Sequence, residues 1–181
     1  TETHNATEAN PITVSHTASG SDRFVLISVM NNETTPTVSY GSQTPTLIAT
    51  IGRLHLYGLV NPATGAQTAS ADSGTSQMQS ITVASFSGVN QTTPNRTPST
   101  ATNDGVATIT TSATSESGDL VVDTALMVNL SMTQDSAQTR IVNMNDPGVG
   151  FLSLGMSTKP GGAPSVSMSW STGESFGDNY L

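Results

Sequence analysis

Phe24-Val25-Leu26-Ile27-Ser28-Val29 is a nearly continuous apolar run that follows the turn sequence Ser19-Gly20-Ser21-Asp22. Successive side chains of a β-strand point to opposite faces, so a strand that is apolar at almost every position is suited to burial on both faces. Just before the turn, Ile12, Val14 and His16 alternate with polar residues, which is the period of a half-buried strand. This part of the chain therefore predicts β-strands.

Strand signals continue along the rest of the chain at a spacing of about 10 to 15 residues. Further strands are expected at residues 37–40, 45–51, 54–60, 78–86, 106–110, 119–127, 139–144, 151–156 and 166–170. Thr (29 residues) and Ser (25 residues) are abundant in the chain of 181, and both disfavour helices. We therefore predict an all-β fold, an antiparallel β-sandwich or jelly roll of about ten strands with no helix.

The chain is expected to form one domain, because 181 residues is an ordinary length for a single domain. Residues 1–11 are polar and lack periodicity, so we expect a flexible N-terminal arm. Residues 12–181 are expected to form the β-sandwich, with a long polar loop at residues 87–105. That loop lacks an apolar run and contains Pro94 and Pro98. No internal repeat of fixed period is visible, so a solenoid or a propeller is not expected.

The charge balance limits the classes of partner. Five Lys and Arg against thirteen Asp and Glu give a net charge of −8, which excludes nucleic-acid binding through a basic surface. Cysteine is absent, so stability must come from sheet packing or from partner chains. No apolar run approaches the roughly 18 to 20 residues of a membrane-spanning helix, so membrane insertion is not expected. The chain is expected to be either a mature secreted protein without its signal peptide or a protein that has lost only its initiator Met.

Motifs for catalysis and for cofactors are also absent from the sequence. There is no G-x-S-x-G nucleophile motif, and His4, His16 and His55 are too widely spaced for a zinc motif. Asp119 and Asp123 would lie on one face of a strand about 13 Å apart, which is too far for joint acid and base catalysis on one bond. We therefore predict that the chain is not an enzyme and has no catalytic residue, cofactor or metal site. Calcium binding by loop carboxylates is left open, without named ligands.

Several positions are candidates for glycosylation. The sequence N-x-S/T occurs at Asn5, Asn32, Asn90, Asn95 and Asn129. Thr93 and Thr97 precede prolines in the polar loop, a composition suited to O-linked sugars. The alternative interpretation is a polar loop that is simply solvated. Covalent glycans are thus an expected partner, and the occupancy of each site stays open.

Six short motifs resemble those of a known kind of module. They are Val14-Ser15-His16-Thr17, Ser19-Gly20-Ser21-Asp22-Arg23-Phe24-Val25-Leu26-Ile27, Val38-Ser39-Tyr40-Gly41, Tyr57-Gly58-Leu59-Val60-Asn61-Pro62, Ser85-Phe86-Ser87-Gly88-Val89 and Gly118-Asp119-Leu120-Val121-Val122-Asp123. Together they resemble a β-sandwich module of large microbial surface and extracellular proteins, over about residues 12 to 170 of this chain. The resemblance implies an extracellular or cell-surface location and a structural or adhesive role. It supplies no catalytic residue.

One part of the chain departs from that module. Modules of this kind usually end with one more apolar strand, whereas residues 171–181 contain two glycines and no alternating run. A sandwich without its last strand would expose an unpaired edge and an apolar groove. A strand from a neighbouring copy of the chain could cover both.

These observations lead to a hypothesis for function. The chain is expected to be a non-catalytic structural subunit of an extracellular fibre or surface filament, a homopolymer assembled head-to-tail by strand complementation. Residues 10–17 are the expected donor strand, with Ile12, Val14 and His16 as the candidate inter-subunit side chains. Residues 171–181 are the alternative donor. Two other functions stay open: a virion surface protein, such as a capsid decoration or tail-fibre protein, and a carbohydrate-binding or adhesive module.

Overall fold

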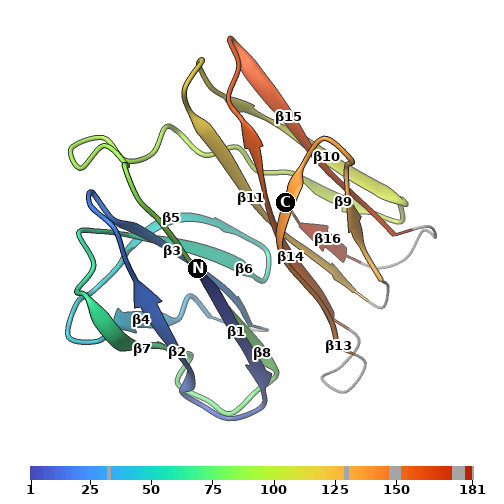
Figure 1. The fold of residues 1–181 in the computed structure, drawn as a ribbon. Helices are drawn as coiled ribbons and strands as arrows, with labels where there is room; N and C mark the ends of the chain where they lie inside the picture. The colour runs from blue at the N-terminus through green and yellow to red at the C-terminus, as the bar shows by residue number, and fades with distance from the viewer. Residues whose placement is uncertain (32–33, 129–130, 147–151, 173–177, 181) are drawn as a thin grey trace. The chain divides into compact units, whose positions relative to one another are not determined.

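The structure is a computed structural model that describes residues 1–31, 34–128, 131–146, 152–172 and 178–180 (Figure 1). In this part of the chain the regular elements are all β-strands, and neighbouring strands of each sheet run antiparallel. The prediction of an all-β fold with antiparallel sheets is confirmed.

The chain divides into two compact units, Thr1–Asn95 and Arg96–Leu181. This differs from the single domain expected over residues 12–181. The physical reason is that each unit has its own pair of sheets and its own apolar core. The boundary lies within the polar segment expected at residues 87–105, in which the first strand begins only at Thr102.

The first unit consists of two sheets. Its strands are β1 (Glu2–Thr7), β2 (Ile12–Ala18), β3 (Phe24–Asn31), β4 (Thr37–Tyr40), β5 (Thr46–Ile51), β6 (Leu54–Val60), β7 (Gly65–Asp72) and β8 (Gln79–Phe86). A five-stranded sheet has the order β1-β8-β3-β6-β5, and a three-stranded sheet has the order β2-β7-β4. β1 and β7 are not among the expected strands, because both are rich in small and polar residues that give no apolar pattern.

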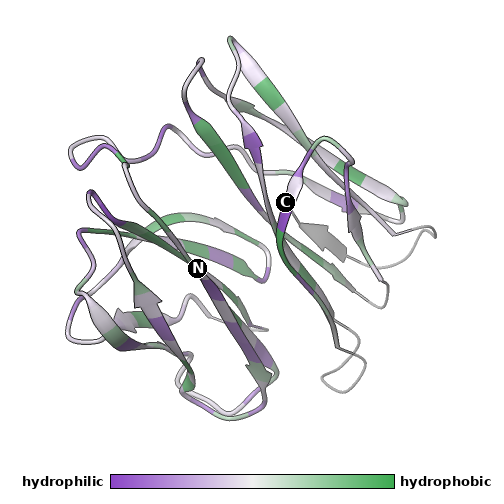
Figure 2. Cartoon of the chain, in the orientation of Figure 1, coloured by the Kyte–Doolittle hydropathy of each residue, from purple (hydrophilic) through white to green (hydrophobic). Residues whose placement is uncertain are grey.

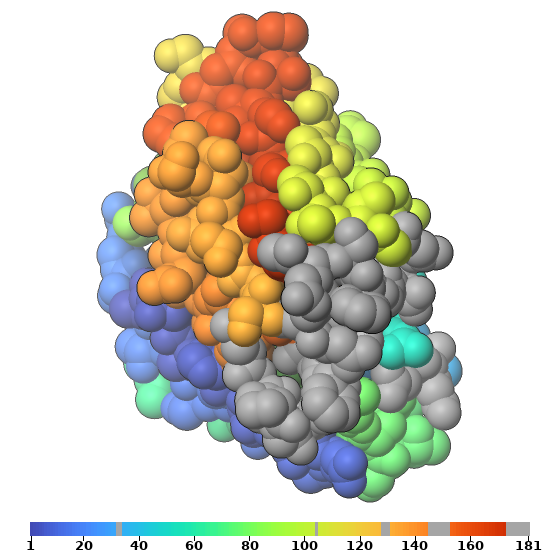
Figure 3. Space-filling view, turned by 90° about the vertical axis from the view of Figure 1, so that its right-hand side faces the viewer, coloured from blue at the N-terminus to red at the C-terminus, as the bar shows by residue number. Residues whose placement is uncertain are grey.

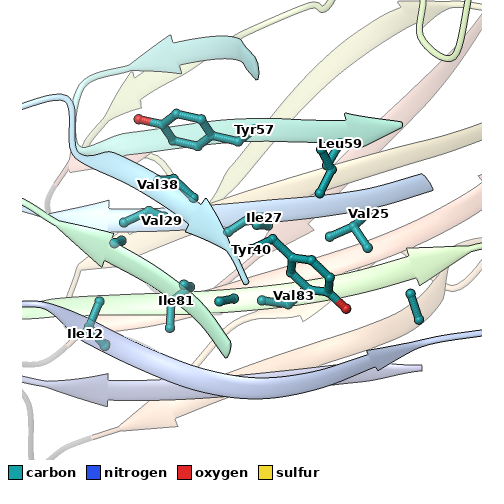
Figure 4. Close-up of a cluster of buried hydrophobic side chains, with 13 residues drawn as sticks. Ile12, Val25, Ile27, Val29, Val38, Tyr40, Tyr57, Leu59, Ile81 and Val83 are labelled. Carbon is teal, nitrogen blue, oxygen red and sulfur yellow. The ribbon is translucent and has the colours of Figure 1, made fainter. Parts of the chain in front are cut away.

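The core of the first unit lies between these two sheets. Val25, Ile27 and Val29 of β3 contribute to it from the five-stranded sheet, and Ile12 and Tyr40 contribute from the three-stranded sheet (Figure 4). All eight residues of β3 are buried, as the apolar run that begins at Phe24 predicts.

Residues 1–11 do not form the expected flexible arm. β1 pairs with β8 from Glu2, opposite Ala84, to Thr7, opposite Gln79. β1 lies at the edge of its sheet and is mainly hydrophilic (Figure 2). Backbone hydrogen bonds can order an edge strand whose side chains face water, so a polar sequence without periodicity does not exclude a strand.

The second unit also consists of two sheets. Its strands are β9 (Thr102–Asp104), β10 (Thr108–Thr114), β11 (Leu120–Val128), β12 (Thr133–Gln134), β13 (Thr139–Asp146), β14 (Leu152–Pro160), β15 (Ser165–Ser171) and β16 (Asp178–Tyr180). The five-stranded sheet has the order β9-β16-β11-β14-β13, and the three-stranded sheet has the order β10-β15-β12. Figure 3 shows the outer side of the three-stranded sheet, with β15 in red beside β10 in yellow-green.

The two units have the same topology. Adding eight to every strand number of the first unit gives the strand order of the second unit in both sheets. The repeat leaves one similarity in the sequence. The same residues, Ile, Thr, Ser and Thr, occur at the same spacing in Ile12-Thr13-Val14-Ser15-His16-Thr17 and in Ile109-Thr110-Thr111-Ser112-Ala113-Thr114. The chain therefore contains an internal repeat of topology, which the sequence does not reveal as a fixed period because most side chains differ.

Trp170 of β15 is fully buried and is the largest side chain in the core of the second unit. The other buried members of this core are Ile109, Ala125, Met127 and Met132. Gly155 of β14 leaves the space that the indole occupies. A Cβ atom at Gly155 would lie 2.6 Å from Trp170 Cζ3 and 2.6 Å from Met132 Cε.

Gly155→Ala is therefore expected to destabilise the second unit by about 2 kcal/mol, because overpacking a filled core forces side chains and backbone to move. Guanidinium unfolding followed by the fluorescence of Trp170, the single Trp of the chain, measures this change. Gly162→Ala is the matched control, since its Cβ would meet only Val166 Cγ2 at an ordinary 3.8 Å. Equal stability of Gly155→Ala and the wild type would contradict the packing described.

Candidate functional site

Asp123 is a carboxylate on β11 that lies inside the second unit, with 7% of its surface exposed. It lies opposite Ser157 in the pairing of β11 with β14. A buried carboxylate is costly unless hydrogen bonds replace the water that it has lost. Asp123 therefore needs hydrogen-bond donors from the residues around it.

Four donors surround the Asp123 carboxylate. Oδ1 accepts hydrogen bonds from the backbone N of Ser157 at 2.9 Å and from Ser157 Oγ at 2.7 Å. Oδ2 accepts hydrogen bonds from Trp170 Nε1 at 2.9 Å and from Gln138 Nε2 at 3.1 Å. We call Asp123, Gln138, Ser157 and Trp170 the Asp123 cluster.

Gln138, a member of the cluster, is the residue just before β13. Its Nε2 also donates to Ser157 Oγ at 2.7 Å, and its Oε1 accepts a hydrogen bond from the backbone N of Ser169 at 2.6 Å. Because a backbone N–H can only donate, this bond fixes which end of the amide faces Asp123. Gln138 is 5% exposed and Ser157 is 0% exposed, so water has little access to these groups.

The cluster changes the acidity of its carboxyl group. Burial raises the pKa of Asp123 to about 6, and the hydrogen bonds from Ser157, Trp170 and Gln138 oppose this rise. Asp119, the other carboxylate of this part of the chain, lies just before β11 and binds Arg96, with its Oδ2 2.7 Å from Arg96 Nε. The two carboxylates thus have different partners.

The raised pKa of Asp123 predicts how the stability of the second unit depends on pH. The folded state holds a proton on Asp123 up to about pH 6, whereas an unfolded Asp releases it near its ordinary value of 3.8. The contribution of Asp123 to the free energy of unfolding is therefore full below about pH 4 and is lost as pH rises through 6. The difference of about 2 pKa units corresponds to about 3 kcal/mol.

Denaturant titrations between pH 4 and pH 7, followed by Trp170 fluorescence, measure this loss. Asp123→Asn removes the titrating group and should remove the slope between those pH values, even though it lowers stability overall. An unchanged slope in Asp123→Asn would show that other groups cause it.

The first unit contains two buried histidines, His16 and His55, whose pKa values shift in the same direction. His16 lies near Thr3, with Nδ1 3.2 Å from Thr3 Oγ1, and its ring meets that of Tyr40 edge-on at a centroid distance of 6.1 Å. Burial lowers the pKa of His16, with a smaller effect of the N-terminal amine, and burial also lowers the pKa of His55. Below the ordinary histidine pKa of 6.5, these two side chains thus bind protons more readily in the unfolded chain than in the folded chain.

The first unit is therefore expected to lose stability as pH falls below the ordinary histidine pKa of 6.5, the opposite direction to the Asp123 effect. Amide hydrogen exchange at the β3 and β8 backbone, corrected for the intrinsic pH dependence of exchange, measures this loss within the first unit. The double variant His16→Gln/His55→Gln should show a shallower dependence. A first unit that gains stability on acidification would contradict the prediction.

The expected inter-subunit residues lie within the first unit itself. Ile12 is fully buried in the core, Val14 packs against it, and His16 is buried. Their strand, β2, pairs with β7 along its whole length from Ile12, opposite Ala71, to Ala18. The structure thus differs from the expectation of a free donor strand, because β2 pairs with β7 and its apolar side chains pack in the core of its own unit. The alternative donor also pairs internally, since Tyr180 and Asn179 of β16 lie opposite Leu126 and Met127.

The glycosylation candidates differ in their surroundings. Asn90, Thr93, Asn95 and Thr97 are exposed in the polar segment at the end of the first unit and the start of the second. Asn90 Oδ1 accepts hydrogen bonds from the backbone N of Thr92 and of Thr93, which forms a local turn. Asn5 is half-buried in β1, and its Nδ2 donates to the carbonyl of Thr13 at 2.8 Å. Asn32 and Asn129 lie outside the described residues.

Among the described residues, no group of three or more His, Cys, Asp or Glu side chains is placed to hold a metal ion. No helix in this same part of the chain is long and apolar enough to cross a bilayer. Tyr40, Tyr57 and Trp170 are buried, so these three rings are not available for stacking on a sugar.

Comparison with protein-family models, with curated proteins and with solved structures gave no match. The resemblance to modules of microbial surface proteins therefore stays a prediction. The Asp123 cluster has no counterpart in the expected sites, because its members come from β11, β14, β15 and the residue before β13. The sequence signal that points to it is a charged residue inside the apolar strand Leu120-Val121-Val122-Asp123-Thr124-Ala125-Leu126.

Proposed function

We propose that the chain is a structural module of two jelly-roll sandwiches and that it serves as a subunit of an extracellular fibre or surface filament. The observation that carries this proposal is the identical strand order of the two units. In each unit the first, eighth, third and sixth strands are neighbours, and the second, seventh and fourth strands form the other sheet, as in a jelly roll. Repetition of a closed sandwich extends a protein while each core stays small and complete.

The surface chemistry supports an extracellular location. Only 10% of the residues are charged, and Thr and Ser dominate the polar residues. The exposed candidates Asn90, Thr93, Asn95 and Thr97 lie in one continuous polar segment, where glycans would not disturb a strand. Sugars on this segment would shield it from proteases and from self-association.

The proposed assembly is head-to-tail and uses strand addition, with β11 in the role of acceptor. In the first unit, β8 pairs with β3 from Phe24 to Asn31. In the second unit, the described part of β16 pairs with β11 at Leu126 and Met127. Residues 120–123 of β11 pair with β14 on one side, and the proposal assigns their other side to an incoming strand of a second copy.

The proposed partner is a second copy of the chain, which contacts this edge through β5. β5 is an edge strand of the first unit. Leu47 on β5 is 42% exposed and Leu120 on β11 is 53% exposed, and they are the two large hydrophobic side chains exposed among the described residues. A contact between two different edges is heterologous, so it propagates from copy to copy. This contact replaces the donor role expected for residues 10–17.

Leu120→Lys and Leu47→Lys are each expected to weaken self-association about tenfold, because a lysine at a strand edge opposes pairing with another strand. Sedimentation velocity over a range of concentrations, with electron microscopy of the concentrated sample, measures the assembly. Thr68→Lys is the matched control, since Thr68 is exposed on β7, between β2 and β4. A wild-type chain that stays monomeric at every concentration would overturn the proposed assembly.

A further inference from the structure

The first unit shows that the fold does not require the Asp123 cluster. Asp123 is the fourth residue of β11, and Ile27 is the fourth residue of β3, the strand with the same place in the first unit. Ile27 lies opposite Tyr57 in the first unit, where Asp123 lies opposite Ser157 in the second. An apolar side chain is therefore enough to fill the core at the fourth position of this strand. The carboxylate needs an explanation beyond packing, because a buried charge is rarely the more stable choice.

The cluster brings together a hydroxyl, a carboxylate and a carboxamide. Ser157 Oγ donates its proton to Asp123 Oδ1 at 2.7 Å, which directs its lone pairs toward other neighbours. One such neighbour is Gln138 Nε2, at 2.7 Å. The carbonyl carbon of Gln138, Cδ, is bonded directly to Nε2, so Cδ reaches Ser157 Oγ when the amide turns out of this hydrogen bond. A nucleophile, its base and an acyl group are thus neighbours in the cluster.

The other contacts of Gln138 suit acyl transfer. Its Oε1 accepts the backbone N–H of Ser169 at 2.6 Å, and such a donor stabilises the negative charge that develops on a carbonyl oxygen under attack. Its Nε2 lies 3.1 Å from Asp123 Oδ2, so the carboxyl group can return a proton to the nitrogen. Trp170 Nε1 and the backbone N of Ser157 hold the two carboxylate oxygens in these directions.

We propose that Ser157 and Gln138 join in an intramolecular ester, formed by the Asp123 cluster itself. Ser157 Oγ attacks Gln138 Cδ while Asp123 takes the hydroxyl proton. The C–N bond of the amide then breaks, Asp123 delivers the proton to the leaving nitrogen, and ammonia departs. The bond formed is Oγ–Cδ, the bond broken is Cδ–Nε2, and the proton moves from oxygen to nitrogen. No oxidant, reductant, water or cofactor is consumed.

Burial and acidity both favour this reaction. The three reacting groups are at most 7% exposed, which limits access of the water that would hydrolyse the ester. The pKa of Asp123, raised to about 6 by burial, suits a group that takes and returns a proton near neutral pH. The ester would tie the start of β13 to β14 and would close a loop between residues 138 and 157. This inference stands independently of the proposed fibre.

Mass spectrometry of the full chain tests the proposal directly. The intact wild-type protein is expected to be lighter than its sequence by one ammonia. Trypsin cuts after Arg96 and Arg140 but not at the Lys159-Pro160 bond, so Gln138 and Ser157 fall in different peptides, 97–140 and 141–181. These two peptides should appear as one linked species that hydroxylamine separates. An ammonia lost by cyclisation elsewhere would leave the peptides unlinked.

Variants assign the roles of the three side chains. Ser157→Ala should give no linked peptide, and Asp123→Asn should slow linkage at least about a hundredfold. Ser153→Ala is the matched control, because Ser153 is also buried on β14 and lies outside the cluster. Ser153→Ala should stay fully linked. Circular dichroism of each variant checks that it is folded.

The wild-type measurement decides the proposal even if a variant fails to fold. A folded wild-type chain that keeps its full mass and unlinked peptides after long incubation at pH 6 to 8 would overturn it. Linkage that persists in Ser157→Ala would also overturn it. Neither result bears on the fibre, which the Leu47 and Leu120 variants test separately.

Discussion

Each five-stranded sheet has an apolar inner face that must be covered, and the three-stranded sheet of the same unit covers it. The other features of the chain depend on this constraint. It places Ile12 of β2 in the core of the first unit, and it places Trp170 against Gly155 in the second unit. Because each unit meets the constraint alone, the polar segment between the units needs no core residue and can carry exposed Asn and Thr side chains.

The two units meet the same constraint with different chemistry. The first unit places Ile27 at the centre of its core, and the second unit places a carboxylate at the corresponding position of β11. The carboxylate is tolerated because four donors from Ser157, Gln138 and Trp170 replace its hydration. Loss of any one donor would leave a buried acceptor unsatisfied, so the second core depends on all three donor residues together.

The sequence predicts the fold class and many of the strands, because an apolar run such as that beginning at Phe24 has few alternatives to a strand. It does not predict β1, because the side chains of β1 form no apolar pattern and its pairing with β8 uses backbone groups. It also does not predict two units, because the repeat is preserved in strand order more than in residues. The sequence marks Asp123 as a charged residue in an apolar strand, but it does not identify the partners, since Ser157 and Trp170 lie on other strands and Gln138 lies just before β13.

A chain without cysteine lacks the covalent link that most often stabilises extracellular domains. Such a link matters most in a structural protein that is pulled along its length, because noncovalent strand pairs can separate one after another. A Ser–Gln ester would supply it from residues that need no oxidising compartment, and it would form only after folding has brought β11, β14 and the residue before β13 together. Such a bond would form only in folded second units, since the unfolded chain does not hold Ser157, Asp123 and Gln138 in contact.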